Sequence, residues 1–229
     1  KTYLVTGGAG FIGSNLVDQL KKQNWEVVVI DNESAESNIK FYWRNDTHNY
    51  KTDITNHQEF NEICQSHKPH CIFHLAAESR IQPTIENPQD ACLTNVVGTC
   101  NVLQAARECK ERVVYSSTSS AYGLKNDPPL KEDMPTDCLN PYSVTKVAGE
   151  ALCKMYYNLF GVETIIFRYF NVYGPREPVK GQYAPVVGLF LRQKDEGKKM
   201  TVVGDGKQRR DYTHVNDVVS ANILAATCK

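Results

Sequence analysis

Short apolar runs rich in β-branched residues alternate along the chain with longer amphipathic stretches. The short runs predict strands over Thr2–Thr6, Glu26–Asp31, Cys71–Leu75, Arg112–Ser116 and Val162–Arg168. The longer stretches predict helices over Gly13–Gln23, Gln58–His67, Pro88–Glu108 and Pro141–Phe160. Because the predicted strands are apolar almost throughout, we expect helices on both of their faces. The pattern therefore predicts an α/β fold with a doubly wound parallel sheet.

Two stretches depart from this alternation. The polar segment Asn32–Asn49 predicts a loop with little structure of its own. A second break follows Arg168, where glycines and prolines cluster at Gly174, Pro175, Pro178, Gly181 and Pro185. Beyond it the pattern predicts a helix (Val186–Glu196), a short strand (Met200–Val203) and a final helix (Asn216–Thr227). We expect a sheet domain over residues 1–174, the start of a truncated substrate-binding region over 175–210, and a helix returning to the sheet domain over 211–229.

Composition narrows the classes of function. The 26 basic and 26 acidic residues cancel, so the 229-residue chain has no net field to attract nucleic acid or an anionic membrane. No apolar run has the length of a membrane span, and a strand rather than a signal peptide is predicted from Thr2. The eight cysteines form no CxxC pair, which favours free thiols in a reducing compartment over disulfides or a metal site. We expect a cytoplasmic protein without a metal.

A glycine-rich loop joins the first predicted strand to the first predicted helix. Gly7, Gly10 and Gly13 have the spacing that permits a tight turn, close approach to a pyrophosphate and close packing of the helix on the strand. The helix N-terminus then offers N–H donors to the phosphates. The loop predicts a dinucleotide site on a Rossmann-type sheet, with Phe11 and Ile12 among the cofactor contacts.

Acidic residues that follow the next strands refine the choice of cofactor. Asp31 ends the second predicted strand, where a carboxylate can accept hydrogen bonds from the adenosine ribose and repels a 2′-phosphate. Asn32 and its neighbours supply no cation, so NAD is favoured over NADP. Without the glycine loop, Asp31 would be interpreted as an ordinary turn residue. Asp53 and Ile54 are candidates to contact the adenine. The alternative for Asp53 is that it caps a helix that starts near Thr55.

Candidate catalytic residues lie later in the chain. Tyr142 and Lys146 are one helical turn apart, so they share a helix face. An ammonium group near a phenol lowers the phenol pKa, which would let Tyr142 act as a general base, and Lys146 could also hold the nicotinamide ribose. The alternative is a surface pair on a helix. The hydroxyl run Ser116–Ser120 follows a predicted strand and either faces the ligand crevice at the carboxyl edge of the sheet or forms a solvated loop.

Together these residues resemble the extended short-chain dehydrogenase/reductase family. The matching segments are TGGAGFIG (6–13), Asp31-Asn32, HLAA (74–77), YSSTSSAYG (115–123), PYSVTK (141–146), RYFNVYGPR (168–176) and GDGKQRRDYTHVNDVV (204–219). They run in the family's order over essentially the whole chain. The resemblance implies an enzyme of nucleotide-linked sugars, in the epimerase branch.

The resemblance also implies roles for individual residues. It makes Thr118, Tyr142 and Lys146 catalytic, with Thr118 bonding the sugar hydroxyl. Further substrate contacts would be Ser119, Asn171 and Arg210, with Arg209 as the alternative to Arg210, although both arginines could be surface charges. Cofactor contacts would include Leu75, Ala76, Ala77 and Asn95. A homodimer is implied through the helices Pro88–Glu108 and Pro141–Phe160, unless their apolar faces pack on the sheet.

The residues after Thr118 indicate which reaction the resemblance implies. Family dehydratases carry Asp-Glu there, and decarboxylases tend to carry a glutamate two positions on, whereas this chain has Ser119 and Ser120. The expected function is therefore an NAD-dependent 4-epimerase of a UDP-hexose or UDP-N-acetylhexosamine, working by transient oxidation at C4. The alternatives are a 4,6-dehydratase, a decarboxylase or a reductase of the same family. A non-catalytic NAD-binding protein is a further alternative, but such proteins typically lose the tyrosine–lysine pair.

Overall fold

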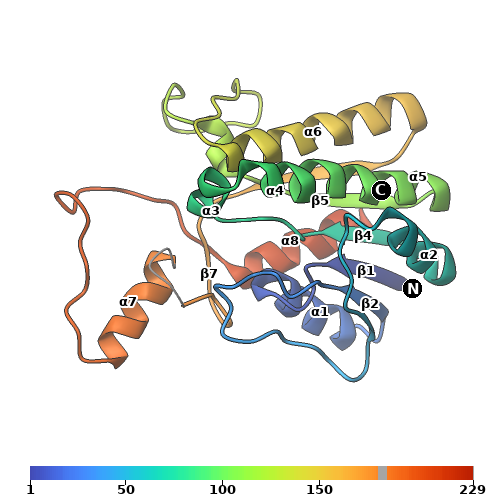
Figure 1. Cartoon of the computed structure of the whole chain (residues 1–229), viewed down its shortest axis with the longest axis horizontal. Coiled ribbons are helices and arrows are strands. Elements are labelled where there is room, and N and C mark those ends of the chain that lie inside the picture. Colours follow the sequence, from blue (N-terminus) through green and yellow to red (C-terminus); the bar gives the residue numbers. More distant parts are fainter. Residues whose placement is uncertain (180–184, 229) are drawn as a thin grey trace.

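A six-stranded parallel sheet forms the centre of the molecule (Figure 1). The computed structural model describes residues 1–179 and 185–228. The strand order is β3-β2-β1-β4-β5-β6, with β1 and β4 adjacent where the direction of winding reverses. The strands are β1 (Thr2–Thr6), β2 (Glu26–Ile30), β3 (His48–Tyr50), β4 (Cys71–His74), β5 (Arg112–Thr118) and β6 (Thr164–Tyr169). The predicted doubly wound α/β fold is confirmed.

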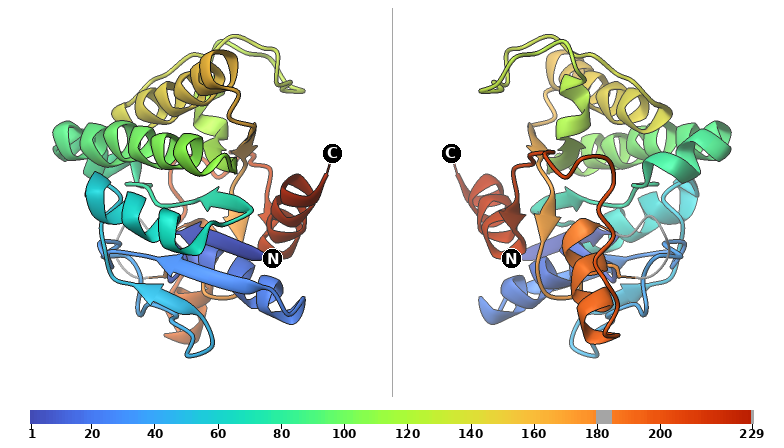
Figure 2. Two further views of the ribbon diagram at one scale, coloured as in Figure 1. Left: turned by 90° about the vertical axis from the view of Figure 1, so that its right-hand side faces the viewer. Right: turned by 90° about the vertical axis from the view of Figure 1, so that its left-hand side faces the viewer.

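Helices cover both faces of this sheet, as Figure 2 shows from two sides. On one face lie α2 (His57–His67), α5 (Thr99–Cys109) and α6 (Pro141–Phe160), and on the other lie α1 (Phe11–Lys22) and α8 (Val215–Thr227). Alternate residues of each strand belong to the two apolar clusters, so that Leu4 packs with Phe60 of α2 and Val5 packs with Leu16 of α1. This explains why the central strands are apolar throughout.

The start of α6 is sharply defined, which matters because Tyr142 is its second residue. Asn140 and Ser143 form a reciprocal capping box, and Pro141 occupies the first turn, where its missing N–H costs nothing. The helix ends at Gly161, which adopts a left-handed conformation with φ +69°. The predicted bounds Pro141–Phe160 are confirmed.

The helix predicted over Pro88–Glu108 is divided in the structure. It consists of α4 (Pro88–Cys92), a π-helical turn η1 (Leu93–Gly98) and α5, and it is preceded by α3 (Ile81–Glu86), which the sequence pattern did not predict. The π turn widens the helix where Asn95 points inward, and such turns occur mostly at functional sites.

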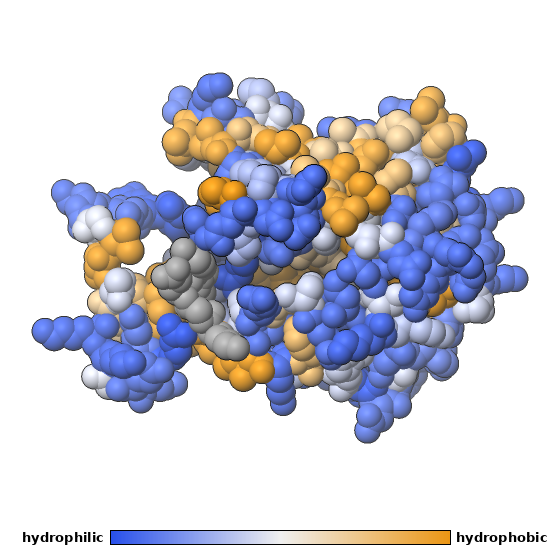
Figure 3. All heavy atoms as spheres, in the orientation of Figure 1, coloured by the Kyte–Doolittle hydropathy of each residue, from blue (hydrophilic) through white to orange (hydrophobic). Residues whose placement is uncertain are grey.

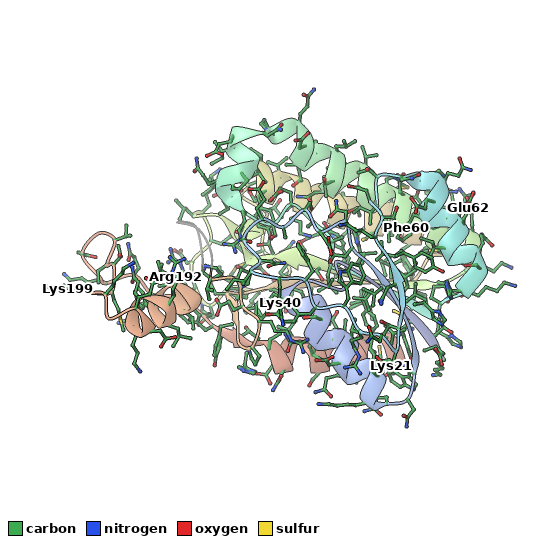
Figure 4. All side chains as sticks on the ribbon, turned by 60° about the horizontal axis from the view of Figure 1, so that its bottom comes forward. Lys21, Lys40, Phe60, Glu62, Arg192 and Lys199 are labelled. Atoms are coloured by element: carbon green, nitrogen blue, oxygen red, sulfur yellow. The ribbon has the colours of Figure 1, made fainter. Side chains whose placement is uncertain are left out.

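The region after Gly174 is less regular. A two-stranded parallel sheet pairs β7 (Val172–Tyr173) with β8 (Thr213–His214), and α7 (Val186–Asp195) stands apart from the body (Figure 1). The strand predicted over Met200–Val203 was wrong: Val202 and Val203 are exposed, and no described strand lies beside them to pair with. Figure 4 places Arg192 and Lys199 at the opposite end of the molecule from Phe60 and Glu62 of α2.

The other differences are small. The predicted loop Asn32–Asn49 ends in β3, and a 3₁₀ turn η2 (Ser119–Tyr122) follows β5. β5 itself continues two residues beyond the predicted end and therefore carries Thr118.

Candidate active site

A cavity of about 740 Å³ opens at the carboxyl edge of the sheet, beside the ends of β1, β4 and β5. This is the edge where open parallel sheets bind their ligands. Most of the predicted site residues line it: Gly7, Gly10, Phe11, Ile12, Gly13, Asp31, Asn32, Ile54, Leu75, Ala76, Ala77, Thr118, Ser119, Tyr142, Lys146 and Asn171. Folding thus brings together residues from both ends of the chain.

Two glycines of the loop, Gly7 and Gly13, are packed too closely for any side chain. A Cβ on Gly7, whose φ is +66°, would lie 2.9 Å from the backbone nitrogen of Ala76, and one on Gly13 would lie 2.1 Å from the carbonyl oxygen of Gly7. The first residues of α1, Phe11 and Ile12, line the cavity, so the positive end of the helix dipole faces it. A bare backbone at a helix N-terminus fits a pyrophosphate.

Asp31 is 8% exposed and lies beside this loop. Its carboxylate accepts hydrogen bonds from the backbone N–H of Ala9 (3.1 Å) and of Glu33 (2.8 Å). Burial raises the pKa of Asp31, and these backbone hydrogen bonds offset part of that rise. The cavity residues that follow it, Asn32, Ser34 and Ala35, carry no positive charge. This arrangement fits a ribose with free hydroxyl groups rather than a 2′-phosphate.

Asp53 lies outside the cavity lining. It accepts hydrogen bonds from the backbone and hydroxyl of Thr55 and from the side chain of Asn32 (2.7 Å). Burial raises its pKa, but these hydrogen bonds lower the pKa overall. The residue that caps α2 is Asn56, so Asp53 is not the helix cap and instead holds the turn before it. Its contact with Asn32 makes it a support for a residue that does face the cavity.

Thr118, Tyr142 and Lys146 come together at the centre of the site. Thr118 ends β5, and its hydroxyl is near enough to the phenol of Tyr142 to oppose the rise of its pKa. Lys146 is 4% exposed, and its ammonium group lies 4.8 Å from the centre of the Tyr115 ring. Burial lowers the pKa of Lys146 to about 8, while the nearby Cys153 and Glu150 oppose that shift.

The structure corrects our expectation for the phenol. We predicted that Lys146 lowers the pKa of Tyr142, but burial raises it, and the lowering influence comes from the Thr118 hydroxyl. The physical reason is that the phenol is desolvated and the lysine ammonium, also desolvated, lies over Tyr115.

A buried ion pair behind the hydroxyl run was not predicted. Arg168 forms a bidentate pair with Glu150 (2.8 and 2.7 Å), and Glu150 also accepts a hydrogen bond from Ser117 (2.6 Å). Burial raises the pKa of Glu150, but its contacts with Arg168 and Ser117 lower the pKa overall. The pair ties α6, β5 and β6 together beneath Thr118. Glu150 follows Lys146 by one helical turn, and this spacing was the only feature of the sequence that could have placed Glu150 near the site.

Two of the predicted residues, Asn95 and Arg210, lie outside the cavity lining. Asn95 is buried, with its side chain bonded to the backbone of Glu78 and to Thr145. Arg210 is exposed and donates to the carbonyl of Arg209 (2.9 Å), which is also exposed. A third predicted residue, Asn171, does line the cavity. Its side chain donates to the carbonyl of Asp211 (2.8 Å).

Two charged residues in the cavity wall were missed. Arg80 and Glu177 come from segments far apart in sequence and both line the cavity. Burial lowers the pKa of Arg80, whereas the nearby Glu78 and Glu177 raise it. Burial raises the pKa of Glu177. Nothing in the sequence pattern pairs residues this distant.

The described part of the chain contains neither a candidate metal site nor a candidate membrane-spanning helix. Within residues 1–179 and 185–228, no cluster of three or more histidine, cysteine or acidic side chains could hold a metal ion. None of the helices in that part of the chain combines the length and apolarity needed to cross a bilayer.

Comparison with known proteins identifies the family. Residues 3–228 match the model of the NAD dependent epimerase/dehydratase family. A putative UDP-glucose 4-epimerase of Methanocaldococcus jannaschii is 36% identical over 99% of this chain and 73% of its own length. A UDP-N-acetyl-alpha-D-glucosaminuronate decarboxylase of Bacillus cytotoxicus is 38% identical over 98% of this chain and 71% of its own length.

A solved structure supports the same conclusion. The UDP-glucose 4-epimerase of Thermus thermophilus, in complex with NAD, superposes with a TM-score of 0.91 at 28% identity, covering 100% of this chain and 75% of that one. The predicted cofactor, NAD, is thereby confirmed at the level of the family. The resemblance drawn from the motifs is also confirmed: the chain belongs to the NAD dependent epimerase/dehydratase family.

Proposed function

We propose that this protein is an NAD-dependent 4-epimerase of a nucleotide-linked sugar, either a UDP-hexose or a UDP-N-acetylhexosamine. The observation that carries the proposal is the meeting of Thr118, Tyr142 and Lys146 in the cavity that also holds the bare glycine loop. NAD supplies reversible hydride acceptance at a carbinol carbon. The chain's own residues then have to bind the sugar, move one proton and exclude water.

Tyr142 is the residue that moves the proton. Its phenolate would take the proton of the C4 hydroxyl as the sugar is oxidised and return it when the 4-keto sugar is reduced on its other face. Burial raises the pKa of Tyr142, and the Thr118 hydroxyl opposes that rise and so favours the charged form. Lys146, buried and with its pKa lowered to about 8, would hold the nicotinamide ribose and supply positive charge nearby.

The serines after Thr118 favour epimerisation over elimination. Ser119 and Ser120 line the cavity and carry no group that ionises near neutral pH. Loss of water or of carbon dioxide needs an additional acid or base beside the reacting carbon. The hydroxyls are suited to orienting a sugar by hydrogen bonds instead.

A decarboxylase or dehydratase is the second candidate. Its support is the decarboxylase relative from Bacillus cytotoxicus and the presence of Glu177 in the cavity wall. Burial raises the pKa of Glu177, so that it could act as an acid supplied by a different segment.

The boundaries and the assembly belong to this proposal as well. Residues 1–174 would bind NAD, residues 175–210 would begin the substrate-binding region, and the helix within 211–229 would return to the NAD-binding domain. The homodimer proposal rests on exposed apolar side chains along η1 and α6, among them Leu93, Val97 and Val144. Figure 3 shows apolar surface over this part of the molecule. The free thiols support a reducing, cytoplasmic location.

Product analysis tests the reaction. The protein is incubated with UDP-glucose, UDP-N-acetylglucosamine or UDP-glucuronate without added cofactor, and products are followed by mass spectrometry and proton NMR. An isomer of unchanged mass supports epimerisation, whereas loss of water or carbon dioxide would establish the second candidate. Tyr142→Phe should abolish turnover and leave NAD binding intact. Activity that survives this substitution would remove Tyr142 from its assigned role.

A further inference from the structure

A chain of buried polar side chains starts beneath the glycine loop. Thr6, the last residue of β1, accepts hydrogen bonds from the backbone N–H groups of Leu75 and Ala76, both at 3.1 Å. Its hydroxyl oxygen also lies 2.8 Å from Nδ1 of His74, and Nε2 of His74 lies 2.9 Å from the hydroxyl of Thr99. Thr6, His74 and Thr99 are each no more than 1% exposed.

Each hydrogen in this chain can be assigned. Thr6 already accepts two backbone hydrogens, so its own proton points to Nδ1 of His74. Thr99 donates its proton to the carbonyl of Asn95 (2.6 Å), so it accepts from Nε2 of His74. His74 is therefore the neutral tautomer protonated on Nε2. Burial, followed by the charge of Lys146, lowers the pKa of His74 to about 3, in agreement with this assignment.

From Thr99 and His74 two branches reach the helix that carries Tyr142 and Lys146. Along the first, Thr99 donates to the carbonyl of Asn95, the Asn95 side chain donates to the hydroxyl of Thr145 (3.0 Å), and Thr145 donates to the carbonyl of Tyr142 (2.9 Å). Along the second, the ring of His74 packs against the ring of Tyr115 (centroids 5.7 Å apart), and the Tyr115 phenol donates to the carbonyl of Lys146 (3.2 Å). Both branches end on backbone atoms of the two catalytic residues.

The other end of the chain touches the cofactor site. The N–H of Ala76, held by Thr6, belongs to the segment against which Gly7 packs so closely. Leu75, Ala76 and Gly7 all line the cavity. A shift of β4 relative to α6 would break one of these bonds and leave a buried polar group without its partner, which is costly.

We propose that His74 and Thr99 are positioning residues that set the catalytic tyrosine and lysine relative to the cofactor-binding loop. The hydrogen bonds of the chain have defined directions, and the chain links the glycine-loop side of the cavity to the side that carries Tyr142. Its catalytic consequence rests on the proposed function, but its geometry does not. Misplacement of reacting groups by a fraction of an ångström reduces turnover by about tenfold or more.

The first test measures the protein without cofactor or substrate. Nitrogen-15 NMR should show His74 as the Nε2-protonated neutral ring down to pH 5. A ring protonated on Nδ1, or one that titrates near pH 6.5, would overturn the proposal. In Thr99→Val, the backbone amide resonances of Tyr142 and Lys146 should shift, and in Thr99→Ser they should return to the parent positions. Unchanged resonances in Thr99→Val would also overturn it.

The second test measures turnover. Thr99→Val should lower kcat about tenfold, with KM for the UDP-sugar within about twofold, and Thr99→Ser should restore kcat. Thr227→Val is the matched control, because Thr227 also donates to the carbonyl four residues earlier (2.9 Å) but lies far from the chain, on the exposed side of α8. Equal losses of kcat in Thr99→Val and Thr227→Val would contradict a positioning role. If the parent protein turned over no UDP-sugar at all, the proposed function would fail while the NMR results would still decide the inference.

Discussion

Two walls of the cofactor cavity are held in place by different interactions. The inner wall, formed by the ends of β1, β4 and β5 and by α6, rests on buried apolar packing and on the polar chain through His74. The outer wall, formed by residues 33–47 and 174–178, rests mainly on ion pairs at the surface. Asp18 of α1 bridges Arg44 (2.7 Å) and Arg176 (2.6 Å).

The outer wall contains further contacts of the same kind. The guanidinium group of Arg176 lies 4.8 Å from the ring centre of Tyr42, and the backbone N–H of Tyr42 donates to the carbonyl of Ala9 (2.8 Å). Phe41, next to Tyr42, lines the cavity. Partly exposed ion pairs contribute little and are screened by salt. The comparison therefore indicates a closely packed inner wall facing an outer wall that is held by weaker contacts.

The largest effect on NAD binding is expected at the glycine loop. Gly13→Ala would place a methyl group against the backbone of Gly7, at a position where neither segment can yield. We expect unfolding to become easier by about 3 kcal/mol and NAD affinity to fall about a hundredfold. Gly197→Ala is the control, since nothing lies within 4 Å of its Cβ position and only its φ of +66° opposes the change. Calorimetric titration with NAD should leave Gly197→Ala unaffected; an equal loss in both variants would contradict the comparison.

The inner wall should also differ from the exposed segment around Val202 in its response to the loss of an apolar side chain. Phe73→Ala in β4 should cost about 3–5 kcal/mol of unfolding free energy because the side chain is fully buried. Val202→Ala should change it by less than about 0.5 kcal/mol, because Val202 is 63% exposed. Urea denaturation measures both. Similar costs would show that the segment around Val202 is packed in solution.

The buried amine of Lys146 should make stability depend on pH. Its pKa is about 8 in the folded protein and 10.5 in the unfolded chain, so between these values the unfolded chain binds more protons. The contribution of Lys146 to stability therefore rises with pH from about 8 to about 10.5. Lys146→Met should be more stable than the parent at pH 7, by about 2–3 kcal/mol, and this difference should shrink at pH 10. A difference that is constant with pH would mean that the amine is hydrated.

The smallest effect on stability is expected at Asp18. Asp18→Asn removes the two ion pairs that Asp18 makes with the outer wall and should lower the unfolding free energy by less than about 1 kcal/mol. NAD should nevertheless dissociate faster, by about threefold, and 0.5 M salt should reduce the difference from the parent. Asp46→Asn is the control, because Asp46 pairs with Arg44 only at the exposed side. Stopped-flow displacement of NAD gives the rates, and equal rates in all three proteins would exclude a closing role for Asp18.

The sequence was most informative where a residue's role is local. The apolar runs predicted the bounds of β1, β2 and β4–β6 to within about two residues. Strands that are buried on both faces are apolar at nearly every position, so their ends are easy to locate in the sequence. The predicted bounds of α6 agree with the structure, where a capping box and Pro141 begin the helix and Gly161 ends it. The spacing of the loop glycines predicted a bare backbone turn, and the packing leaves no room for a side chain at Gly7 or Gly13.

The sequence was least informative where a role depends on partners far away along the chain. Asn95 belongs to a hydrogen-bond chain rather than to the cavity lining. Arg210 is exposed and donates to the carbonyl of Arg209 instead of lining the cavity. The pairing of Arg168 with Glu150 and the neutral tautomer of His74 depend on strand order and register, which no local pattern contains.

The sequence by itself therefore determined the α/β class, the glycine loop with its acidic partner, and the presence of a threonine, a tyrosine and a lysine able to do carbinol chemistry. These depend on backbone sterics and on residue type over a few neighbouring positions. Only the tertiary structure decided which way the pKa of Tyr142 shifts and which side chains hold it in place. Those depend on burial and on hydrogen bonds between residues that meet only when the sheet has formed.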